Sequence, residues 1–255
     1  MPPFRKPRRT KIIATLGPAT DEPDVLEKLI KAGVDVVRLN FSHGHADEQR
    51  KRVQAVRDLS EKLGRHVGIL ADLQGPKIRI ARFEDGKVSL QEGAKFTIDV
   101  ALASTAGDIT QVGCDYKPLA NDVTEGDRLL LDDGRIVLDV EAVKGSKIKC
   151  TVVVGGILSN NKGINLQGGG LSANALTDKD KQDIKTAAEM RVDFVAVSFP
   201  RSAEDMHQAR ALVKAAGSQA HLIAKIERAE ALDVLEEIVD ASDAVMVARG
   251  DLGVE

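Results

Sequence analysis

The fold is decided by residues 11–73, which read KIIATLGPATDEPDVLEKLIKAGVDVVRLNFSHGHADEQRKRVQAVRDLSEKLGRHVGILADL. Three short apolar runs predict strands at residues 11–16, 34–39 and 66–73, and the β-branched second run is expected to be buried on both faces. Between them, a helix capped by Thr20 or Asp21 is expected to run to about Lys31, with Gly33 as its stop. A longer helix is expected from His45 to Leu63, closed by Gly64. Strands alternating with helices predict parallel pairing through right-handed crossovers.

The pattern changes between residues 75 and 170, where no helical stripe is visible. Short strands are predicted at residues 95–100, 128–131, 135–142 and 147–154. The pair Asp133-Gly134 between two apolar runs predicts a β-hairpin. The segment therefore indicates a separate β domain inserted into the α/β domain.

The α/β rhythm returns after Gly170. Thr177 followed by Asp180 predicts a capping box that opens a helix to about Arg191. Further elements are predicted as strands at 194–198, 222–226 and 244–247 and helices at 202–216 and 229–240. Six parallel strands result, and no closing element follows. A doubly wound sheet could stop there, whereas an eight-stranded barrel could not.

Composition excludes several functional classes. The chain has 255 residues, 36 basic and 39 acidic, with a net charge of -3, and this balance gives no electrostatic footprint for nucleic acid or anionic lipid. Aromatic residues are only 3%, which argues against a base-stacking surface. Cys114 and Cys150 are too few for a disulfide framework, and no apolar run approaches the ~18 residues of a membrane span. A cytoplasmic, reducing location is the default expectation.

Polar side chains cluster at the ends of the apolar strands, where β/α folds carry their active sites. Residues two apart in a strand share a face, so Arg38 with Asn40, and Lys225 with Glu227, are expected to point into one pocket. Glu227 and Asp251 suit Mg²⁺ as hard oxygen ligands, although ordinary solvated carboxylates would look the same. Zinc is disfavoured because no His or Cys clusters nearby.

The lysine and arginines of this region also have two readings. Lys225 either pairs with Glu227 or stabilises an enolate or a transferring phosphoryl group. Arg38, Arg79 and Arg249 are surface charges or clamps for phosphate or carboxylate. A P-loop nucleotide site is excluded, because no GxxxxGK[ST] segment occurs. Spacing alone therefore predicts a Mg²⁺-assisted site for a small anionic substrate, covered by a β lid, and does not name the reaction.

Six segments together resemble the pyruvate kinase family, particularly its bacterial forms, in order over essentially the whole chain. They are RRTKIIATLGPAT (8–20), VRLNFSHG (37–44), DLQGPKIR (72–79), NNKGIN (160–165), AKIE (224–227) and MVARGDLG (246–253). The resemblance implies transfer of a phosphoryl group from phosphoenolpyruvate to ADP, giving pyruvate and ATP. It also implies a (β/α)₈ TIM-type barrel, here truncated after about six strands, with an all-β domain inserted after strand 3.

The implied domains are a first barrel part at 1–74, a β lid at 75–170 and a second barrel part at 171–255, without the family's C-terminal domain. The full-length parent is expected to be a homotetramer. The resemblance implies catalysis by Lys225 and Arg38, and a substrate site completed by Gly250 and Asp251.

Other matched positions imply ion and nucleotide binding. Mg²⁺ falls to Glu227 and Asp251, the monovalent cation to Asn40, Ser42, Asp72 and the Leu73 carbonyl, and the nucleotide to Asn40, His43, Arg79 and Lys179.

Lys77 and Leu73 depart from the family pattern, since potassium-dependent members usually carry Glu and often Thr there. A lysine ammonium could take the role of K⁺, so we expect the parent enzyme to need little or no added potassium. The chain alone is expected to be unstable and nearly inactive, because an open sheet leaves edges and apolar faces exposed. Two other functions stay open: a Mg²⁺-dependent aldolase or lyase acting through a pyruvate enolate, and a non-catalytic fragment.

Overall fold

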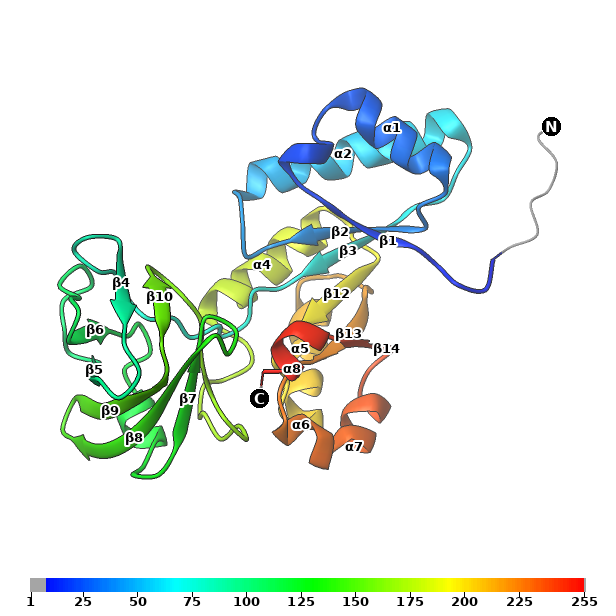
Figure 1. Cartoon of the computed structure of the whole chain (residues 1–255). Helices are drawn as coiled ribbons and strands as arrows, with labels where there is room; N and C mark the ends of the chain where they lie inside the picture. The colour runs from blue at the N-terminus through cyan, green and yellow to red at the C-terminus, as the bar shows by residue number, and fades with distance from the viewer. Residues whose placement is uncertain (1–7, 255) are drawn as a thin grey trace.

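The computed structural model describes residues 8–254. Residues 1–7 and 255, which the first and last predicted segments include, lie outside this described part. The chain forms two units (Figure 1). The parallel-sheet unit comprises strands β1–β3 and β12–β14 with their helices, and the β unit comprises strands β4–β11 with helix α3.

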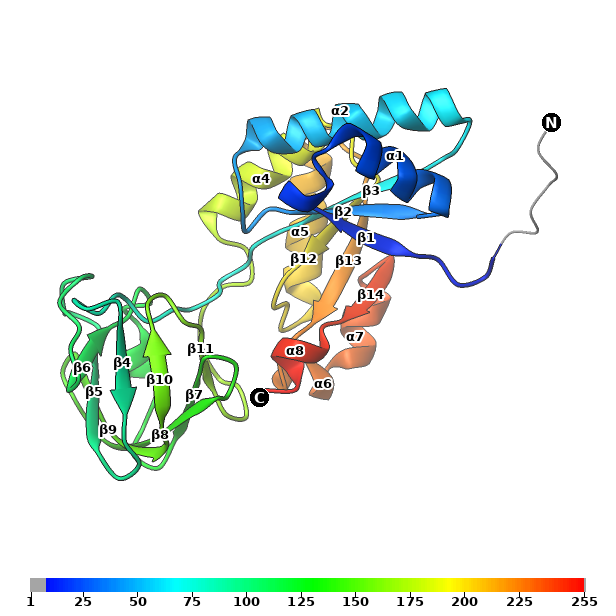
Figure 2. The ribbon, with the colours of Figure 1, turned by 45° about the horizontal axis from the view of Figure 1, so that its top comes forward.

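Six parallel strands form the sheet of the first unit in the order β1-β2-β3-β12-β13-β14. Their bounds are Ile13–Leu16, Val36–Asn40, Gly68–Asp72, Phe194–Val197, His221–Ile226 and Ala244–Val247. The order follows the chain without reversal, and Figure 2 shows the strands turning progressively from β1 to β14. A doubly wound sheet reverses its order at a switch point, so that alternative is wrong.

Helices follow the strands in alternation, as predicted. They are η1 (Pro18–Thr20), α1 (Pro23–Ala32), α2 (Ala46–Leu63), α4 (Asp178–Glu189), α5 (Ala203–Ala215), α6 (Glu230–Asp233), α7 (Leu235–Asp240) and α8 (Arg249–Leu252). Gly33 and Gly64 end α1 and α2 in the left-handed conformation, at φ 109° and 61°, and Thr177 opens α4 with the predicted capping box. Within residues 8–254, no helix combines the length and apolar character needed to cross a membrane.

Several local expectations were wrong. The cap of α1 is Glu22 rather than Thr20 or Asp21. The helix predicted at 229–240 is divided into α6 and α7, because Val234 takes a non-helical conformation at φ −120° and ψ 25°. β2 is not buried on both faces, since Val36 and Arg38 are only partly covered while Val37 and Leu39 are fully buried.

Alternation along the strands separates two faces of the parallel sheet. One face packs under the helices in a large apolar core that includes Val37, Ile69 and Val195. The opposite face, called here the open face, carries a small cluster of Leu70, Ala196 and Ile223. Because side chains two apart share a face, the residues two positions beyond this cluster also lie on the open face.

The β unit has its own sheets and its own core. A six-stranded sheet has the order β11-β7-β8-β9-β5-β6, and β4 pairs with β10. The strands are β4 (Lys87–Leu90), β5 (Lys95–Asp99), β6 (Gln111–Gly113), β7 (Arg128–Leu131), β8 (Ile136–Lys144), β9 (Lys147–Val154), β10 (Gly156–Ser159) and β11 (Ile164–Leu166). A short helix, α3 (Leu119–Asp122), interrupts the predicted all-β character. Phe96 and Ile98 lie in a core distinct from that under the parallel sheet.

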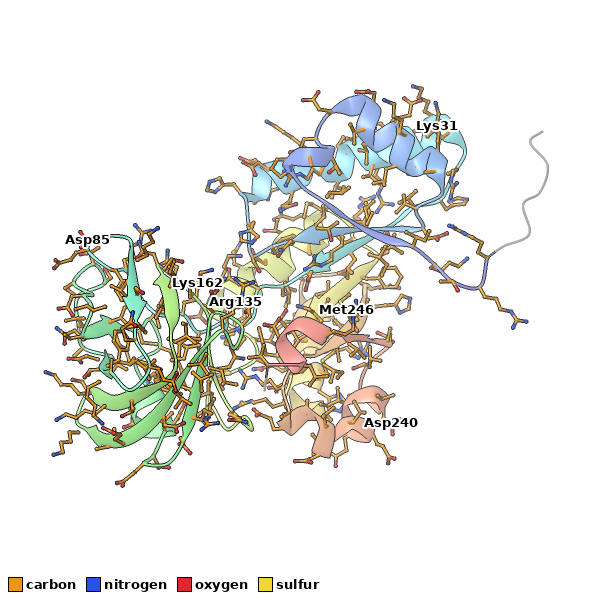
Figure 3. All side chains as sticks on the ribbon, viewed as in Figure 1. Lys31, Asp85, Arg135, Lys162, Asp240 and Met246 are labelled. Carbon is orange, nitrogen blue, oxygen red and sulfur yellow. The ribbon has the colours of Figure 1, made fainter. Side chains whose placement is uncertain are left out.

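The predicted hairpin at Asp133-Gly134 joins antiparallel β7 and β8, with Asp132, Asp133 and Gly134 all at positive φ. Asp132 pairs with Lys162 at 2.7 Å and with Arg135 at 3.8 Å. Figure 3 shows Arg135 and Lys162 on the side of the β unit nearest the parallel-sheet unit. The hairpin therefore lies against the segment through which the chain returns to the parallel sheet.

Cys114 and Cys150 are buried, free thiols in the core of the β unit. Burial raises the pKa of each thiol to about 12. Because the thiolate is the reactive form, we expect neither cysteine to react with iodoacetamide at pH 8 in the native state. Mass spectrometry of the native protein should show no adduct, and unfolding in guanidinium should give two. Rapid native labelling of either cysteine would contradict the burial.

Candidate active site

The functional side chains predicted at strand ends follow directly from the alternation of the open face. Each lies two residues after an apolar residue of that face: Arg38 after Val36, Asp72 after Leu70, Ser198 after Ala196 and Lys225 after Ile223. Since parallel strands end together, these side chains meet at the carboxyl edge of the sheet.

Lys225 is the centre of this cluster. Its Nζ lies 2.8 Å from Glu227 Oε1 and donates to Ser198 Oγ, also at 2.8 Å. Asp72 Oδ1 lies 3.4 Å from the same nitrogen. The Lys225 side chain is only 11% exposed, so its charge depends on these partners rather than on water. The result is a fixed ammonium at the carboxyl edge.

Glu227 is buried and fully engaged. Its Oε2 accepts a hydrogen bond from the Phe199 N–H at 2.9 Å. Burial raises the pKa of Glu227 above its usual value, while the Lys225 ammonium and the Phe199 N–H favour the ionised form. The nearby charge of Asp251 also raises the pKa of Glu227, as like charges do. Two carboxylates therefore lie within electrostatic reach of each other.

Arg38 and Asp72 form the other side of the cluster. Arg38 Nε donates to Asp72 Oδ2 at 2.6 Å, and its Nη1 donates to Thr15 Oγ1 at 3.0 Å. Arg38 is partly exposed at the rim, whereas Asp72 is buried. The guanidinium thus presents positive charge toward solvent from a position held by two neighbouring strands.

Asp251 lies on α8, a helix that the sequence pattern did not predict. Its Oδ1 pairs with Lys77 Nζ at 3.2 Å. Lys77 was expected to replace a monovalent cation beside Asn40, Ser42 and Asp72; the described contacts join its ammonium to Asp251 instead. This pairing brings the segment after β3 against the segment after β14.

Glu227 and Asp251 fit a hard divalent cation by their donor chemistry. Both carboxylates face lysine ammoniums, Lys225 and Lys77, which balance their charge without a metal. Within residues 8–254, no group of three or more His, Cys, Asp or Glu side chains is arranged to hold a metal. Mg²⁺ suits a set of two carboxylates, because water and substrate oxygens complete its shell.

The residues expected to hold a monovalent cation are partly engaged elsewhere. Asn40 Oδ1 accepts from the Ser42 N–H at 3.0 Å, and the Leu73 carbonyl accepts from Ser198 Oγ at 2.8 Å. Asp72 Oδ1 is buried without a hydrogen bond. That orphaned anionic oxygen fits a cation, and Lys225 at 3.4 Å already supplies one.

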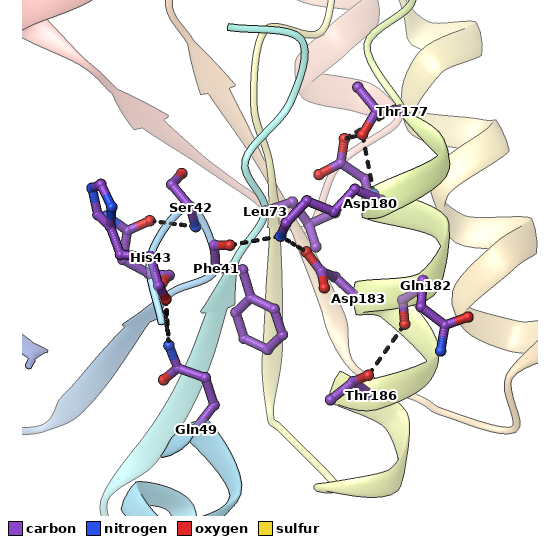
Figure 4. Close-up of polar contacts among 12 residues, drawn as sticks. Phe41, Ser42, His43, Gln49, Leu73, Thr177, Asp180, Gln182, Asp183 and Thr186 are labelled. Carbon is purple, nitrogen blue, oxygen red and sulfur yellow. Dashed lines mark hydrogen bonds and ion pairs between the residues drawn. The ribbon is translucent and has the colours of Figure 1, made fainter. Parts of the chain in front are cut away.

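The loop after β2 faces the first turns of α4 (Figure 4). Lys179 Nζ donates to the Phe41 carbonyl at 2.7 Å and pairs with Asp183. Gln49 Nε2 donates to the His43 carbonyl at 3.1 Å, while the His43 side chain is exposed. Asn40, His43 and Lys179 are thus brought together around one loop beside the Lys225 cluster.

Arg79 and Gly250 lie apart from this cluster. Arg79 Nη1 donates to the Asn161 carbonyl at 2.9 Å, within the two chain segments that enter and leave the β unit. Gly250 is exposed on α8, one residue before Asp251. Neither has a described contact with Lys225.

Sequence reasoning missed Ser198 and Phe199 as site residues. Ser198 bonds both Lys225 and the Leu73 carbonyl, and Phe199 holds Glu227. The rule that found Arg38 and Lys225 would have found Ser198, since it lies two residues after Ala196. No local signal identifies Phe199, because its contribution comes from its backbone N–H.

Comparison with known proteins identifies relatives of the chain. The model of the pyruvate kinase barrel domain matches residues 7–255. Pyruvate kinase II of Salmonella typhimurium is 58% identical over 254 residues, covering 98% of this chain and 53% of that protein. The pyruvate kinases of Haemophilus influenzae and Mycobacterium tuberculosis (strain H37Rv) are 56% and 48% identical, over 98% and 97% of this chain and 53% and 52% of theirs. The chain spans about half the length of these curated relatives.

Proposed function

Because the chain belongs to the pyruvate kinase family, we propose that it is part of an enzyme that transfers the phosphoryl group of phosphoenolpyruvate to ADP. The bond between phosphorus and the enol oxygen breaks, and a bond from phosphorus to a β-phosphate oxygen of ADP forms. The enolate left behind takes up a proton to become pyruvate. The observation that best supports this reaction is the Lys225 ammonium, fixed between Glu227, Ser198 and Asp72 at the carboxyl edge.

The parallel-sheet unit is proposed to be the first six strands of a (β/α)₈ barrel. Sequential strand order and helices packed on one face support this assignment. The proposed boundaries are 1–74 and 171–255 for the barrel parts and 75–170 for the inserted domain. The crossing after β3 and the separate core of the β unit support the insertion point.

Arg38 is proposed to bind the phosphoryl group, and Lys225 to stabilise the enolate and the transferring group. Transfer of a phosphoryl group needs positioning and charge neutralisation rather than a protein nucleophile. A guanidinium at the rim and a buried ammonium behind it provide charge at two depths. The Gly250 backbone and Asp251 complete the proposed substrate site.

Asn40, His43, Arg79 and Lys179 are proposed to contact the nucleotide. Three of them surround the loop after β2, next to the Lys225 cluster (Figure 4). Arg79 belongs to the segments that join the two units. A nucleotide in this place would lie between the parallel-sheet unit and the β unit.

Glu227 and Asp251 are proposed to hold Mg²⁺, which when bound polarises phosphoryl and enolate oxygens. The two lysines that pair with these carboxylates hold them in place. The β unit is proposed to close over the site and exclude water, which would otherwise accept the phosphoryl group. For the whole protein we also propose a homotetramer in the cytoplasm.

Potassium is proposed to be dispensable. The fixed charge of Lys77 lies within ion-pair distance of Asp251, and Arg38 and Lys225 both face Asp72. We expect the complete natural chain to have equal activity with and without K⁺ in a buffer of inert organic cations. Lys77→Glu removes the fixed charge, and this variant is expected to be activated by K⁺. A large activation of the natural chain by K⁺ would refute the proposal.

The test of the main proposal is formation of ATP from phosphoenolpyruvate and ADP by the complete natural chain. We expect ATP and pyruvate in equal amounts, only with a divalent cation present. Pyruvate-enolate chemistry with an aldehyde acceptor, without ATP, would instead support an aldolase or lyase. Absence of both reactions would support a non-catalytic role.

A further inference from the structure

A buried arginine that has no role in the proposed reaction lies between the two units. Arg228 follows Glu227 directly, yet only 5% of its side chain is exposed. A buried guanidinium is costly unless each contact is specific. The contacts of Arg228 therefore indicate what it holds in place.

Arg228 bonds to the segment by which the chain returns from the β unit. Its Nη1 donates to the Leu171 carbonyl at 3.2 Å. The Leu171 side chain belongs to the core of the β unit. One residue thus has its side chain in the β unit and its carbonyl held by the parallel-sheet unit.

Glu230 strengthens this connection from the start of α6. Its Oε1 accepts from Arg228 at 3.2 Å, and its Oε2 accepts from the Gly170 N–H at 2.9 Å. A Cβ at position 169 would lie 1.7 Å from the same Oε2, and Gly169 has φ 80°. The run of three glycines thus allows the backbone to approach Glu230 closely.

Arg228 also reaches the residue that holds Glu227. Its guanidinium carbon lies 5.5 Å from the centre of the Phe199 ring, within the range of a cation–π contact. Phe199 has φ 55°, which is unusual for a bulky side chain and persists only where its surroundings enforce it. In that conformation its N–H donates to Glu227 Oε2.

We propose that Arg228 is a positioning residue for Glu227. It ties the Phe199 backbone, and hence the orientation of the Glu227 carboxylate, to the return segment at Gly170–Leu171. The position of the β unit is thereby coupled to a carboxylate that binds the metal. The assignment of Glu227 as a metal ligand rests on the proposed function.

The outgoing crossing is held by a similar contact without this coupling. The Gly75 N–H donates to Asp180 Oδ1 at 3.1 Å. The other oxygen of Asp180 accepts from the Thr177 cap of α4. The described bonds of Asp180 therefore end in the cap of α4, whereas those of Arg228 lead to Phe199.

The test compares divalent-metal binding by three variants of the complete natural chain. Mn²⁺ serves as the probe, and its dissociation constant is measured by calorimetry without phosphoenolpyruvate or nucleotide. Arg228→Met is expected to weaken Mn²⁺ binding about 10-fold, the scale of lost outer-shell contacts. Arg228→Lys, which keeps the cation, should recover part of the loss.

Arg210→Met is the matched control. Arg210 likewise donates to one carboxylate, Asp243, and one carbonyl, Ala241, but these precede β14 at the opposite end of the sheet. Its replacement should lower the melting temperature without changing Mn²⁺ affinity. Should Arg228→Met fail to fold by circular dichroism, Arg228→Gln replaces it in every measurement.

A double-mutant cycle with Phe199→Leu separates positioning from general stability. If Arg228 acts through Phe199, the losses of Mn²⁺ affinity for the two changes will not add. Additive losses, or natural affinity in a folded Arg228→Met, would overturn the inference. Weakened Mn²⁺ binding in a protein that forms no ATP would leave the inference standing while the proposed reaction fails.

Discussion

Replacement of Lys225 by methionine is expected to lower the kcat for ATP formation by about 10³-fold, the scale of losing one preorganised group that faces transition-state charge. The methylenes of the side chain are kept, and only the ammonium is removed. Ser198 Oγ, Glu227 Oε1 and Asp72 Oδ1 then lose their shared cation. No other side chain among residues 8–254 has contacts with all three.

Stability must be measured beside activity, because the change leaves buried carboxylates without a partner. Breaking a buried pair in this way costs about 3–5 kcal/mol. Lys225→Arg keeps the charge and serves as the folded comparison. Lys62→Met is the control, since Lys62 is exposed on α2 and pairs with Glu27 at 3.0 Å, far from the carboxyl edge. A folded Lys225→Met protein with natural kcat would contradict the assigned role.

A polypeptide limited to residues 1–255 is expected to self-associate and to form no measurable ATP. Both outer strands of the parallel sheet expose apolar side chains: Val245 is 43% and Val247 61% exposed on β14, and Ile13 is 48% exposed on β1. Leu232 and Val239 on the neighbouring α6 and α7 are also exposed. Unpaired strand edges with apolar side chains favour association between copies.

Size-exclusion chromatography over a range of concentrations measures this association. Val247→Lys places a charge on the β14 edge and should reduce it. Val154→Lys is the matched control, because Val154 is 45% exposed but lies at the end of β9 in the β unit. A monomeric polypeptide with high turnover would refute the expectation, as would equal effects of the two lysine substitutions.

Local sequence was sufficient to predict most elements of the fold. Alternation and β-branched runs located the six parallel strands, since a strand's periodicity depends only on its own residues. Gly33, Gly64 and the Thr177–Asp180 capping box marked helix ends through local backbone conformations and hydrogen bonds. Asp133-Gly134 located the hairpin for the same reason. The break at Val234 and the short α8 had no comparable local signal.

The same alternation predicted which side chains share a face, and so it identified Arg38, Asp72 and Lys225 as neighbours at one edge. It could not predict the partners within that edge. Lys77 contacts Asp251, 174 residues later, and Arg228 contacts Leu171 in the return segment from the β unit. Such pairs depend on the path of the crossings and the curvature of the sheet.

The sequence by itself therefore determined the strands, the helices and the face on which the charged residues lie, because these follow from periodicity and chain direction. Only the tertiary structure decided that Ser198 joins Lys225, that the Phe199 backbone holds Glu227, and that Arg228 links Phe199 to the β unit. The physical reason is that hydrogen bonds and ion pairs require atoms to approach within about 3 Å. Residues distant in the chain reach that separation only through the packing of the whole molecule.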